Sequence, residues 1–327
     1  MSTKLPRRRF LRFAAGAAAL PVVSDLTWAQ SYPTKPVRLI IGIAPGSSPD
    51  ILGRLMAQWL SERLGQPFIV ENRPGGGGNL AIEALVRAPA DGHTLLLVTI
   101  QSAVNATLYD KLNYNFIRDV GPVASISRQT LALEVTPSFP AKTVSDFIAY
   151  AKANPGRLSM ASAGNGTTPH LAGALFKMMA GIDVIHVPYR GGAPALTDLM
   201  GGQVQMAFAD ITSSIEYVRA GKLRALAVST LARSKALPEI PPLAEYLPGY
   251  EASGWFGIGA PKGTPAGTVE RLNREINAGL ADSRIIARYA ELGATVFASS
   301  AADFGKFIGD ETDKWGKVVR SAGLKPE

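Results

Sequence analysis

Two hydrophobic patterns alternate along the chain from residue 37 onward. Residues 37–43 form an apolar run with β-branched side chains, interrupted only by Arg38, which is typical of a buried strand in a parallel sheet. Between residues 51 and 60 the apolar residues recur at helical spacing, and Gly65 marks the end of this helix. The same patterns predict strands at 68–71 and 94–98 and a helix at 80–86. This β-α-β-α-β order predicts a parallel sheet with right-handed crossovers.

A second unit of the same kind begins near Leu131. Thr143 and Asp146 fit a capping box, which predicts a helix that ends near Asn154. Residues 231–250 are rich in proline and predict a loop, whereas the tail from 285 to 323 is mostly helical. The remaining predicted elements are strands at 158–162, 184–187, 204–209, 223–228 and 255–260, and helices at 169–179, after Gly192 and at 264–280.

The length of 327 residues corresponds to roughly two domains. The two units can follow one another in tandem. They can also form a clamp, in which the chain crosses to the second lobe near residue 128 and returns near residue 253. Periodicity alone leaves both arrangements open.

Composition excludes several kinds of chemistry. The chain has no cysteine, which excludes disulfides, thiolate catalysis and thiolate metal sites. Its three histidines, His93, His170 and His186, contain no HExxH pair, so we expect neither a metal nor a cofactor. The glycine run 75–78 lacks both the GxGxxG and the P-loop patterns, which argues against a nucleotide site. Residues 162–164 lack the GxSxG elbow of serine hydrolases.

The first 29 residues have the features of an export signal. A basic segment with paired arginines, residues 6–12, precedes a short apolar stretch at 13–23 and a cleavage point between Ala29 and Gln30. The arginine pair resembles a twin-arginine signal, and an ordinary Sec signal is the alternative. No later apolar stretch is long enough to span a bilayer, so the sequence predicts a periplasmic protein.

Charge gives no sign of a nucleic-acid partner. Part of the formal net charge of +8 lies in the export signal. The remaining excess is mild, and no cluster of Lys and Arg has interleaved aromatic residues. We therefore expect no nucleic-acid binding.

Residues 32–325 resemble the Bug family, the solute receptors of the tripartite tricarboxylate transporter system. Each matching segment is weak alone, but their order and spacing together carry the resemblance. One departure concerns the first loop, where Gly46 is followed by Ser47 and Ser48 instead of the family's usual second glycine. The matching segments are Tyr32–Arg38, Ala44–Gly46 with Asp50, Val70–Asn79, Pro89–Thr94, Ser162–Leu171, Val187–Gly192 and Ala260–Pro265.

The resemblance implies an α/β fold of the two-lobed periplasmic binding protein type (type II, Venus flytrap), with parallel-rich sheets flanked by helices. By this analogy the clamp is the arrangement expected. Lobe 1 then comprises residues 30–127 and 253–327, and lobe 2 comprises residues 128–252. The implied protein is a monomer that closes on a small carboxylate and delivers it to the membrane subunits of a tripartite transporter or to a sensor.

Two loops could hold the carboxylate. In Ser48-Pro49 and in Thr168-Pro169, a hydroxyl at the N-cap and a proline at the first helical position predict the start of a helix. Each follows the carboxyl end of a predicted strand, where free backbone N–H groups and the helix dipole favour an anion. We hypothesise that Ser47, Ser48, Thr167 and Thr168 bind the ligand from opposite lobes; the alternative is that these are simply well-capped helices.

Other candidates have two interpretations each. Asp50 and Asp210 either suit a helix dipole or accept a hydrogen bond from the ligand. His170 lies just inside a helix and resembles a core-edge histidine more than a base, whereas Arg190 either pairs with the ligand or braces its loop. Trp255 is either hinge packing or a cleft wall. The complete set of candidate ligand-binding residues is Pro45, Gly46, Ser47, Ser48, Asp50, Gln101, Ser102, Ser162, Ala163, Gly164, Gly166, Thr167, Thr168, His170, Tyr189, Arg190 and Asp210.

Two classes of function remain at this point. The first is a binding protein that delivers a carboxylate, and the second is an exported α/β enzyme that acts on a similar acid. The sequence contains no nucleophile–base motif, metal cluster or cofactor motif, which favours the binding protein over an enzyme.

Overall fold

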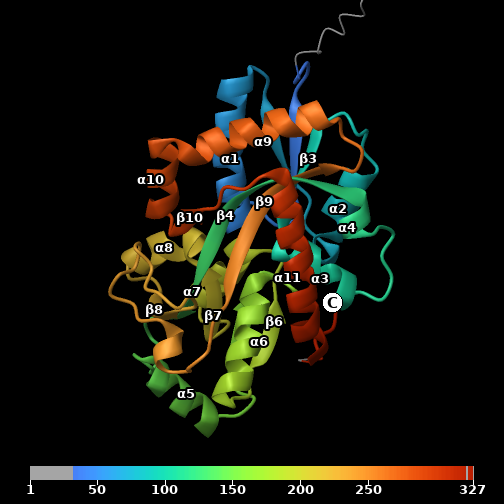
Figure 1. The fold of residues 1–327 in the computed structure, drawn as a ribbon. Coiled ribbons are helices and arrows are strands. Elements are labelled where there is room, and N and C mark those ends of the chain that lie inside the picture. The colour runs from blue at the N-terminus through green and yellow to red at the C-terminus, as the bar shows by residue number, and fades with distance from the viewer. Residues whose placement is uncertain (1–31, 322, 327) are drawn as a thin grey trace, which may run out of the picture.

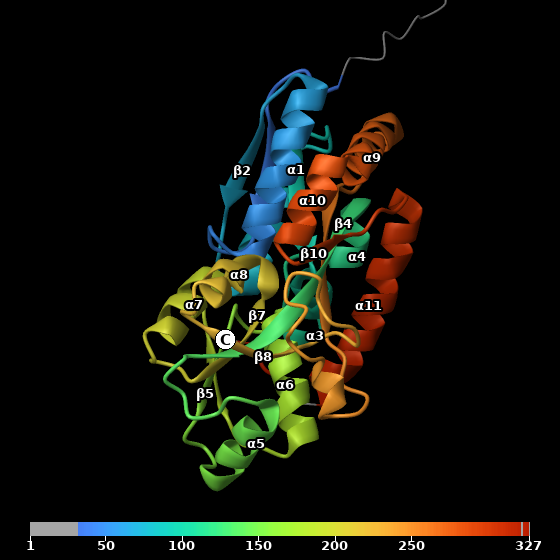
Figure 2. The ribbon, with the colours of Figure 1, turned by 90° about the vertical axis from the view of Figure 1, so that its left-hand side faces the viewer.

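The computed structural model describes residues 32–321 and 323–326, and the predicted export signal lies outside the described residues. The chain forms a ten-stranded mixed sheet flanked by helices (Figures 1 and 2). Along the main path the strands follow the order β2-β1-β3-β9-β4-β7-β5-β6, and β8 and β10 both pair with β4. The α/β class predicted from the sequence is therefore confirmed.

The strands divide into two groups that share one member, β4 (Val120–Val135). Up to Thr130, β4 pairs antiparallel with β9, and from Leu131 onward it pairs antiparallel with β7. We name the two sides of this point lobe 1 and lobe 2. Lobe 1 contains β1 (Val37–Ile41), β2 (Phe68–Asn72), β3 (Thr94–Thr99), β9 (Ser253–Pro261) and β10 (Ala294–Val296); lobe 2 contains β5 (Ser159–Ser162), β6 (Ile185–Pro188), β7 (Met206–Asp210) and β8 (Arg224–Val228).

Helices cover both lobes, as the alternating pattern predicts. In lobe 1 the helices are α1 (Ser48–Leu64), α2 (Asn79–Val86), α3 (Ile100–Leu108), α4 (Phe116–Asp119), α9 (Ala266–Ala281), α10 (Ser283–Glu291) and α11 (Ala301–Ser321), with a 3₁₀ turn η2 at Gly76–Gly78. In lobe 2 they are α5 (Val144–Ala153), α6 (Thr168–Ala180), α7 (Gly192–Met200), α8 (Ile211–Arg219) and the 3₁₀ turn η3 (Leu243–Glu245). Among all the described residues, no helix is long and apolar enough to cross a membrane.

Each lobe has its own hydrophobic core. In lobe 1, one cluster lies between the sheet and helices α1, α9 and α10, and another lies under α2, α3 and α11. In lobe 2, the main cluster lies under α5 and α6. The C-terminal helix α11 packs on α3 and on β4, so the first lobe recovers the tail of the chain as a clamp requires. The predicted lobe boundaries near residues 128 and 253 stay a prediction.

The sequence patterns missed the first part of β4, all of β10 and the helices α3, α4 and α8. Residues 125, 127 and 129 of β4 are polar, so the apolar run that predicts a strand begins only at Leu131. These side chains are nevertheless buried because each has a polar partner: Ser125 Oγ donates to Phe297 O at 2.5 Å, and Gln129 bonds to Ser127 Oγ at 2.7 Å. A strand whose buried residues are polar and hydrogen-bonded internally has no apolar pattern, so the hydrophobic pattern does not predict it.

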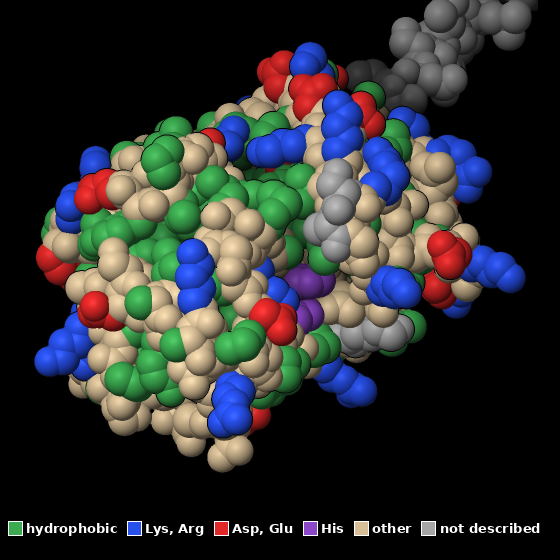
Figure 3. Space-filling view, turned by 90° about the horizontal axis from the view of Figure 1, so that it is seen from below, with side chains coloured by type: hydrophobic (Ala, Val, Ile, Leu, Met, Phe, Trp, Pro, Cys, Tyr) green, Lys and Arg blue, Asp and Glu red, His purple; other side chains and the backbone are tan. Residues whose placement is uncertain are grey.

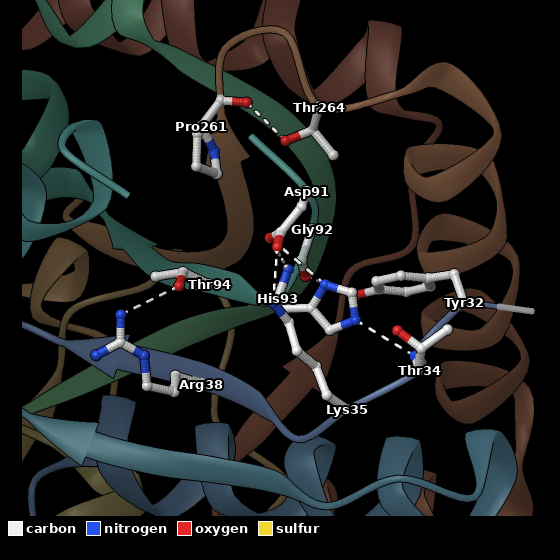
Figure 4. A network of polar contacts seen from close by, with 10 residues as sticks. All are labelled: Tyr32, Thr34, Lys35, Arg38, Asp91, Gly92, His93, Thr94, Pro261 and Thr264. Carbon is white, nitrogen blue, oxygen red and sulfur yellow. Dashed lines mark hydrogen bonds and ion pairs between the residues drawn. The ribbon is translucent and has the colours of Figure 1, made fainter. Parts of the chain in front are cut away.

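A polar network fastens the beginning of the described chain to lobe 1 (Figure 4). Tyr32 donates its hydroxyl proton to Gly92 O at 2.7 Å, and its ring meets the His93 ring edge to face at 5.1 Å. His93 Nε2 accepts from Thr34 N at 3.3 Å, and Lys35 pairs with Asp91 at 3.0 Å. His93 therefore has a structural role, since it contacts Tyr32 and Thr34 at the beginning of the described chain.

Gly257 provides a test of the packing between β9 and α11. A Cβ atom at this position would lie 2.1 Å from Phe304 Cζ and 2.7 Å from Ala124 O, and neither neighbour can move freely. We expect Gly257→Ala to lower the free energy of unfolding by about 1–3 kcal/mol, measured by urea denaturation. Gly267 in α9 has open space around its Cβ position, so Gly267→Ala should be neutral or slightly stabilising. Equal stability of both variants and the wild type would contradict this packing.

Candidate functional site

A small cavity of about 20 Å³ lies between the two lobes, and we call it the interlobe cavity. Residues from the carboxyl ends of β1, β3, β5 and β7 surround it, which is where ligands gather in open α/β sheets. No Lys or Arg is among the described residues that line it. The lining residues are Ile43, Ser47, Pro49, Thr99, Ile100, Gln101, Ala163, Thr167, Thr168, Pro169, Gly192, Asp210 and Phe256.

The same four-residue loop opens a helix on each side of this cavity. Gly46-Ser47-Ser48-Pro49 leads into α1 in lobe 1, and Gly166-Thr167-Thr168-Pro169 leads into α6 in lobe 2. Both glycines have positive φ, 77° and 74°, and both N-cap residues are extended, with ψ 158°. The backbone N–H groups of Ser48 and Thr168 have no acceptor within the described residues. Two positive helix ends therefore border one cavity.

The predicted N-caps were wrong by one residue. The N-caps are Ser47 and Thr167, and the prolines occupy the second helical position. Neither hydroxyl caps its own helix, because each is engaged elsewhere. Ser47 Oγ accepts from Gly192 N of the other lobe at 3.0 Å, and Thr167 Oγ1 donates to Gly164 O at 2.6 Å.

Asp50 and His170 occupy equivalent positions, four residues after the loop glycines. Asp50 Oδ2 accepts from Gly46 N at 2.9 Å, and His170 Nδ1 accepts from Gly166 N at 3.1 Å. The other Asp50 oxygen accepts from Arg54 at 3.0 Å and from Asn72 at 2.9 Å. These three donors lower the pKa of Asp50 against the opposing effect of burial. Both side chains hold their loops, and neither lines the interlobe cavity.

His170 stacks on His186, with ring centroids 3.9 Å apart and planes 3° from parallel. Burial lowers the pKa of His170 to about 4 and that of His186 to about 3, so both rings are neutral near pH 7. His186 Nε2 lies 2.6 Å from Ser162 Oγ, which also accepts from Gly164 N at 3.2 Å. Figure 3 shows histidine side chains at the surface seen from below, and His186 is itself only partly buried. Through the contacts of His170 with Gly166 and of His186 with Ser162, the histidine pair stabilises the loop that precedes α6.

Direct hydrogen bonds join the lobes around the cavity. Gln101 Nε2 donates to Asn165 O at 2.7 Å, and Ala44 N donates to Arg190 O at 3.1 Å. Together with the bond between Ser47 and Gly192, these contacts describe a closed arrangement.

Two carboxyl groups, that of Asp210 at the cavity and that of Glu134 on β4, have no Lys or Arg partner among the described residues. Asp210 ends β7, and its Oδ1 is buried with no hydrogen-bond partner. Glu134 on β4 is fully buried; its Oε1 accepts from Ser214 at 2.5 Å, whereas its Oε2 has no partner. Burial raises the pKa of Asp210 to about 7. Burial, and then the nearby Asp210, raises the pKa of Glu134 to about 8.

A second cavity of about 80 Å³ adjoins the first and shares Gln101 and Ala163 with it. The backbone of Gly75–Gly78 forms one wall, and Gly164, Tyr189 and Arg190 form the other. Arg190 is exposed, and its guanidinium has no partner within the described part of the chain. Tyr189 donates its hydroxyl proton to Asp198 at 2.7 Å.

Three further predicted residues lie outside the interlobe cavity: Pro45, Ser102 and Ser162. Pro45 is exposed in the loop before α1. Ser102 accepts from Thr99 N at 3.4 Å in a capping box at the start of α3 and does not line the interlobe cavity. Ser162 lines only a third recess, of about 10 Å³, which reaches Asp210 from the side of α7.

Sequence reasoning missed several lining residues. Thr99 and Ile100 immediately precede the predicted Gln101, so their position at the carboxyl end of β3 was the available signal. In β9, Phe256 lines the cavity, whereas Trp255 points to the opposite face. There Trp255 packs on Phe304 and donates to Glu311 at 2.9 Å. Trp255 is therefore core packing rather than a cleft wall.

A larger cavity of about 380 Å³ lies on another part of the molecule, between α10–β10 and residues 230–236. It contains none of the predicted site residues. Its size alone gives no reason to prefer it, because the polar groups and helix ends converge on the interlobe cavity.

Comparison with known proteins agrees with this geometry. Residues 52–324 match the model of the tripartite tricarboxylate transporter family receptor. The chain is 35% identical to the protein BugT of Bordetella pertussis, over 95% of each chain. Two solved structures are also similar: Rpa4515 of R. palustris with adipate (37% identity, TM-score 0.88, 90% of this chain and 100% of that one) and MatC from Rhodopseudomonas palustris with bound malate (30%, 0.83, 88% and 100%).

These matches confirm the resemblance on which the predicted fold depended. They cover nearly the whole described chain and include periplasmic binding proteins with bound carboxylates. This chain belongs to the receptor family of the tripartite tricarboxylate transporters, whose members are periplasmic solute-binding proteins.

Proposed function

We propose that this receptor captures a small carboxylate in the interlobe cavity and delivers it to a membrane transporter of the tripartite type or to a sensor. The export signal and a periplasmic location, the monomeric state and the absence of catalysis are parts of the same proposal. The hinge is proposed to lie where the chain passes between the lobes, near residues 128 and 253.

One observation carries the proposal: the paired helix starts of α1 and α6. They bring two sets of backbone N–H groups and the side chains of Ser47, Thr167 and Thr168 to one cavity, and Ser48 follows Ser47 in the same loop. An anion is stabilised at such helix ends without a lysine or arginine. Neutral donors bind a carboxylate less strongly than an arginine clamp does, which suits a protein that must release its ligand.

Binding requires the lobes to separate. A cavity of about 20 Å³ has room for roughly one water molecule, which is too little for an organic acid. The direct bonds from Ser47 to Gly192 and from Gln101 to Asn165 must therefore break before a ligand enters. Two lobes joined at a narrow crossing can open in this way as hinged bodies.

An exported enzyme is the alternative, and the contact between Ser162 and His186 is the observation that favours it. Their separation of 2.6 Å suits a nucleophile and its base. However, Ser162 is fully buried and its oxygen already accepts a bond from Gly164 N. The strongly lowered pKa of His186 also makes it a weak base. We therefore assign the pair a structural role.

A panel of carboxylic acids tests the proposed function. We expect at least one acid among succinate, adipate, malate, lactate and benzoate to raise the melting temperature of the mature protein. Binding to the native state stabilises it by about 2.7 kcal/mol when the ligand concentration is a hundred times Kd. Sodium chloride at equal ionic strength is the control. If neither these acids nor a wider set of mono-, di- and aromatic carboxylates shifts the transition, the protein is not a carboxylate receptor of this kind.

Thr168 is the hydroxyl best placed to donate to the ligand. Its Oγ1 makes no hydrogen bond within the described residues, whereas the proton of Thr167 is used by Gly164 O. We expect Thr168→Val to weaken binding of the best acid by about 1–3 kcal/mol, a loss of roughly five- to hundredfold in affinity. Isothermal titration calorimetry measures the loss.

The matched control is Thr197→Val. Thr197 lies on the exposed side of α7, outside the cavity, and its hydroxyl donates to Ala193 O at 3.1 Å. This variant should bind as the wild type does. Wild-type affinity in Thr168→Val would exclude the proposed contact of its hydroxyl with the carboxylate.

A further inference from the structure

The interlobe cavity combines two features that conflict electrostatically. Its helix ends favour an anion, but the one charged side chain that lines it is itself an acid, Asp210. An ionised Asp210 would repel a carboxylate held at the starts of α1 and α6. Since no Lys or Arg lines this cavity in the described chain, the conflict has no counter-charge to relieve it.

The surroundings of Asp210 favour its neutral form. Its Oδ1 is buried without a hydrogen-bond partner, and the other nearby acid, Glu134, is fully buried with one free oxygen of its own. Ser214 on α8 lies between the two residues, because its hydroxyl contacts Glu134 Oε1 at 2.5 Å and the backbone carbonyl oxygen of Asp210 at 3.4 Å. The charge of Asp210 disfavours ionisation of Glu134, so the two carboxyl groups do not both ionise readily. Burial raises the pKa of Asp210 accordingly, and the nearby Ser48 hydroxyl offsets this only in part.

The charged groups on the surrounding elements do not neutralise Asp210. They are engaged with one another, neutral, or directed to other places. Asp50 pairs with Arg54 on α1, and Asp198 on α7 accepts from Tyr189. On α8, Glu216 pairs with Arg219. On the remaining neighbours, His170 is neutral in its loop contact, and Arg190 lines the adjoining cavity.

We propose that the receptor binds its carboxylate together with one proton, which Asp210 takes up from the solvent as the lobes close. The neutral Asp210 carboxyl then donates a hydrogen bond to the bound anion instead of repelling it. In the open form, water solvates Asp210 and the group loses this proton to the solvent again. This inference rests on the proposed function, because it concerns the same cavity and the same ligand.

Calorimetry measures the proton directly. The acid of the panel with the largest thermal shift is titrated into the mature protein at pH 8 in phosphate and in Tris, which differ in ionisation enthalpy. We expect a difference in the observed heat that corresponds to uptake of nearly one proton per ligand. Affinity should fall as pH rises from 7 to 9, by up to tenfold per pH unit, while the carboxylic acids themselves remain ionised.

Asp210→Asn tests the residue. An amide has the shape of the neutral carboxyl and donates a hydrogen bond, but it does not titrate. This variant should bind the acid with no proton uptake and with an affinity independent of pH, so that at pH 9 it binds more tightly than the wild type. Glu216→Gln on α8, whose side chain is 75% exposed, is the matched control and should keep the wild-type uptake.

The stability of the ligand-free protein gives a second readout. Because the pKa of Asp210 is raised in the native state, the wild type should lose stability as pH rises from about 4 towards 7. Asp210→Asn should lack this part of the loss in urea denaturation. The readout also shows whether the variant folds.

The possible failures are distinguishable. If no acid binds, the proposed function is wrong and the inference falls with it. If an acid binds without proton uptake and with the same affinity at pH 7 and pH 9, the receptor stands and the inference is wrong. A ligand whose ammonium group pairs with ionised Asp210 would give this second result.

Discussion

The continuous strand β4 is the constraint on which the rest of the structure depends. Its 16 residues pair with β9 and β10 in lobe 1 and with β7 and β8 in lobe 2, so one backbone ladder fixes both lobes. At the passage between them, Leu131 N donates to Ser229 Oγ and Ser229 N donates to Leu131 O. This pairing sets how β5 and β1 face each other, and hence where their two helices begin. The cavity lies between these helix starts, which belong to the two lobes that meet where β4 passes from one to the other.

The two loops that border the cavity have the same backbone conformation but hold it with different side chains. Each needs a turn glycine, two hydroxyl residues and an acceptor for the glycine N–H. Lobe 1 uses the carboxylate of Asp50 as that acceptor, and lobe 2 uses the imidazole of His170. Both solutions leave the N–H groups of Ser48 and Thr168 free for an anion. Asp50 and His170, which the sequence offered as ligand-binding residues, are thereby committed to holding the backbone that we propose binds the anion.

The sequence predicted most elements, because apolar runs and helical spacing mark buried strands and amphipathic helices directly. It failed in β4, where Ser125 and Gln129 are buried in polar contacts with residues distant in the chain and Ser127 accepts from Gln129. For the site, the loops at 46–49 and 166–169 could be found from their turn and helix-start signals. The directions of Asp50 and His170 could not, because they depend on three-dimensional contacts.

The hydrogen bonds between the lobes have a consequence for the speed of capture. Gln101 with Asn165, and Ser47 with Gly192, bond through protein groups alone, so these contacts need no ligand to form. If ligand enters only after the lobes separate, as we propose, the observed association rate levels off at the opening rate when ligand is abundant. A receptor built in this way responds to a sudden rise in solute at a rate limited by its own loops rather than by diffusion.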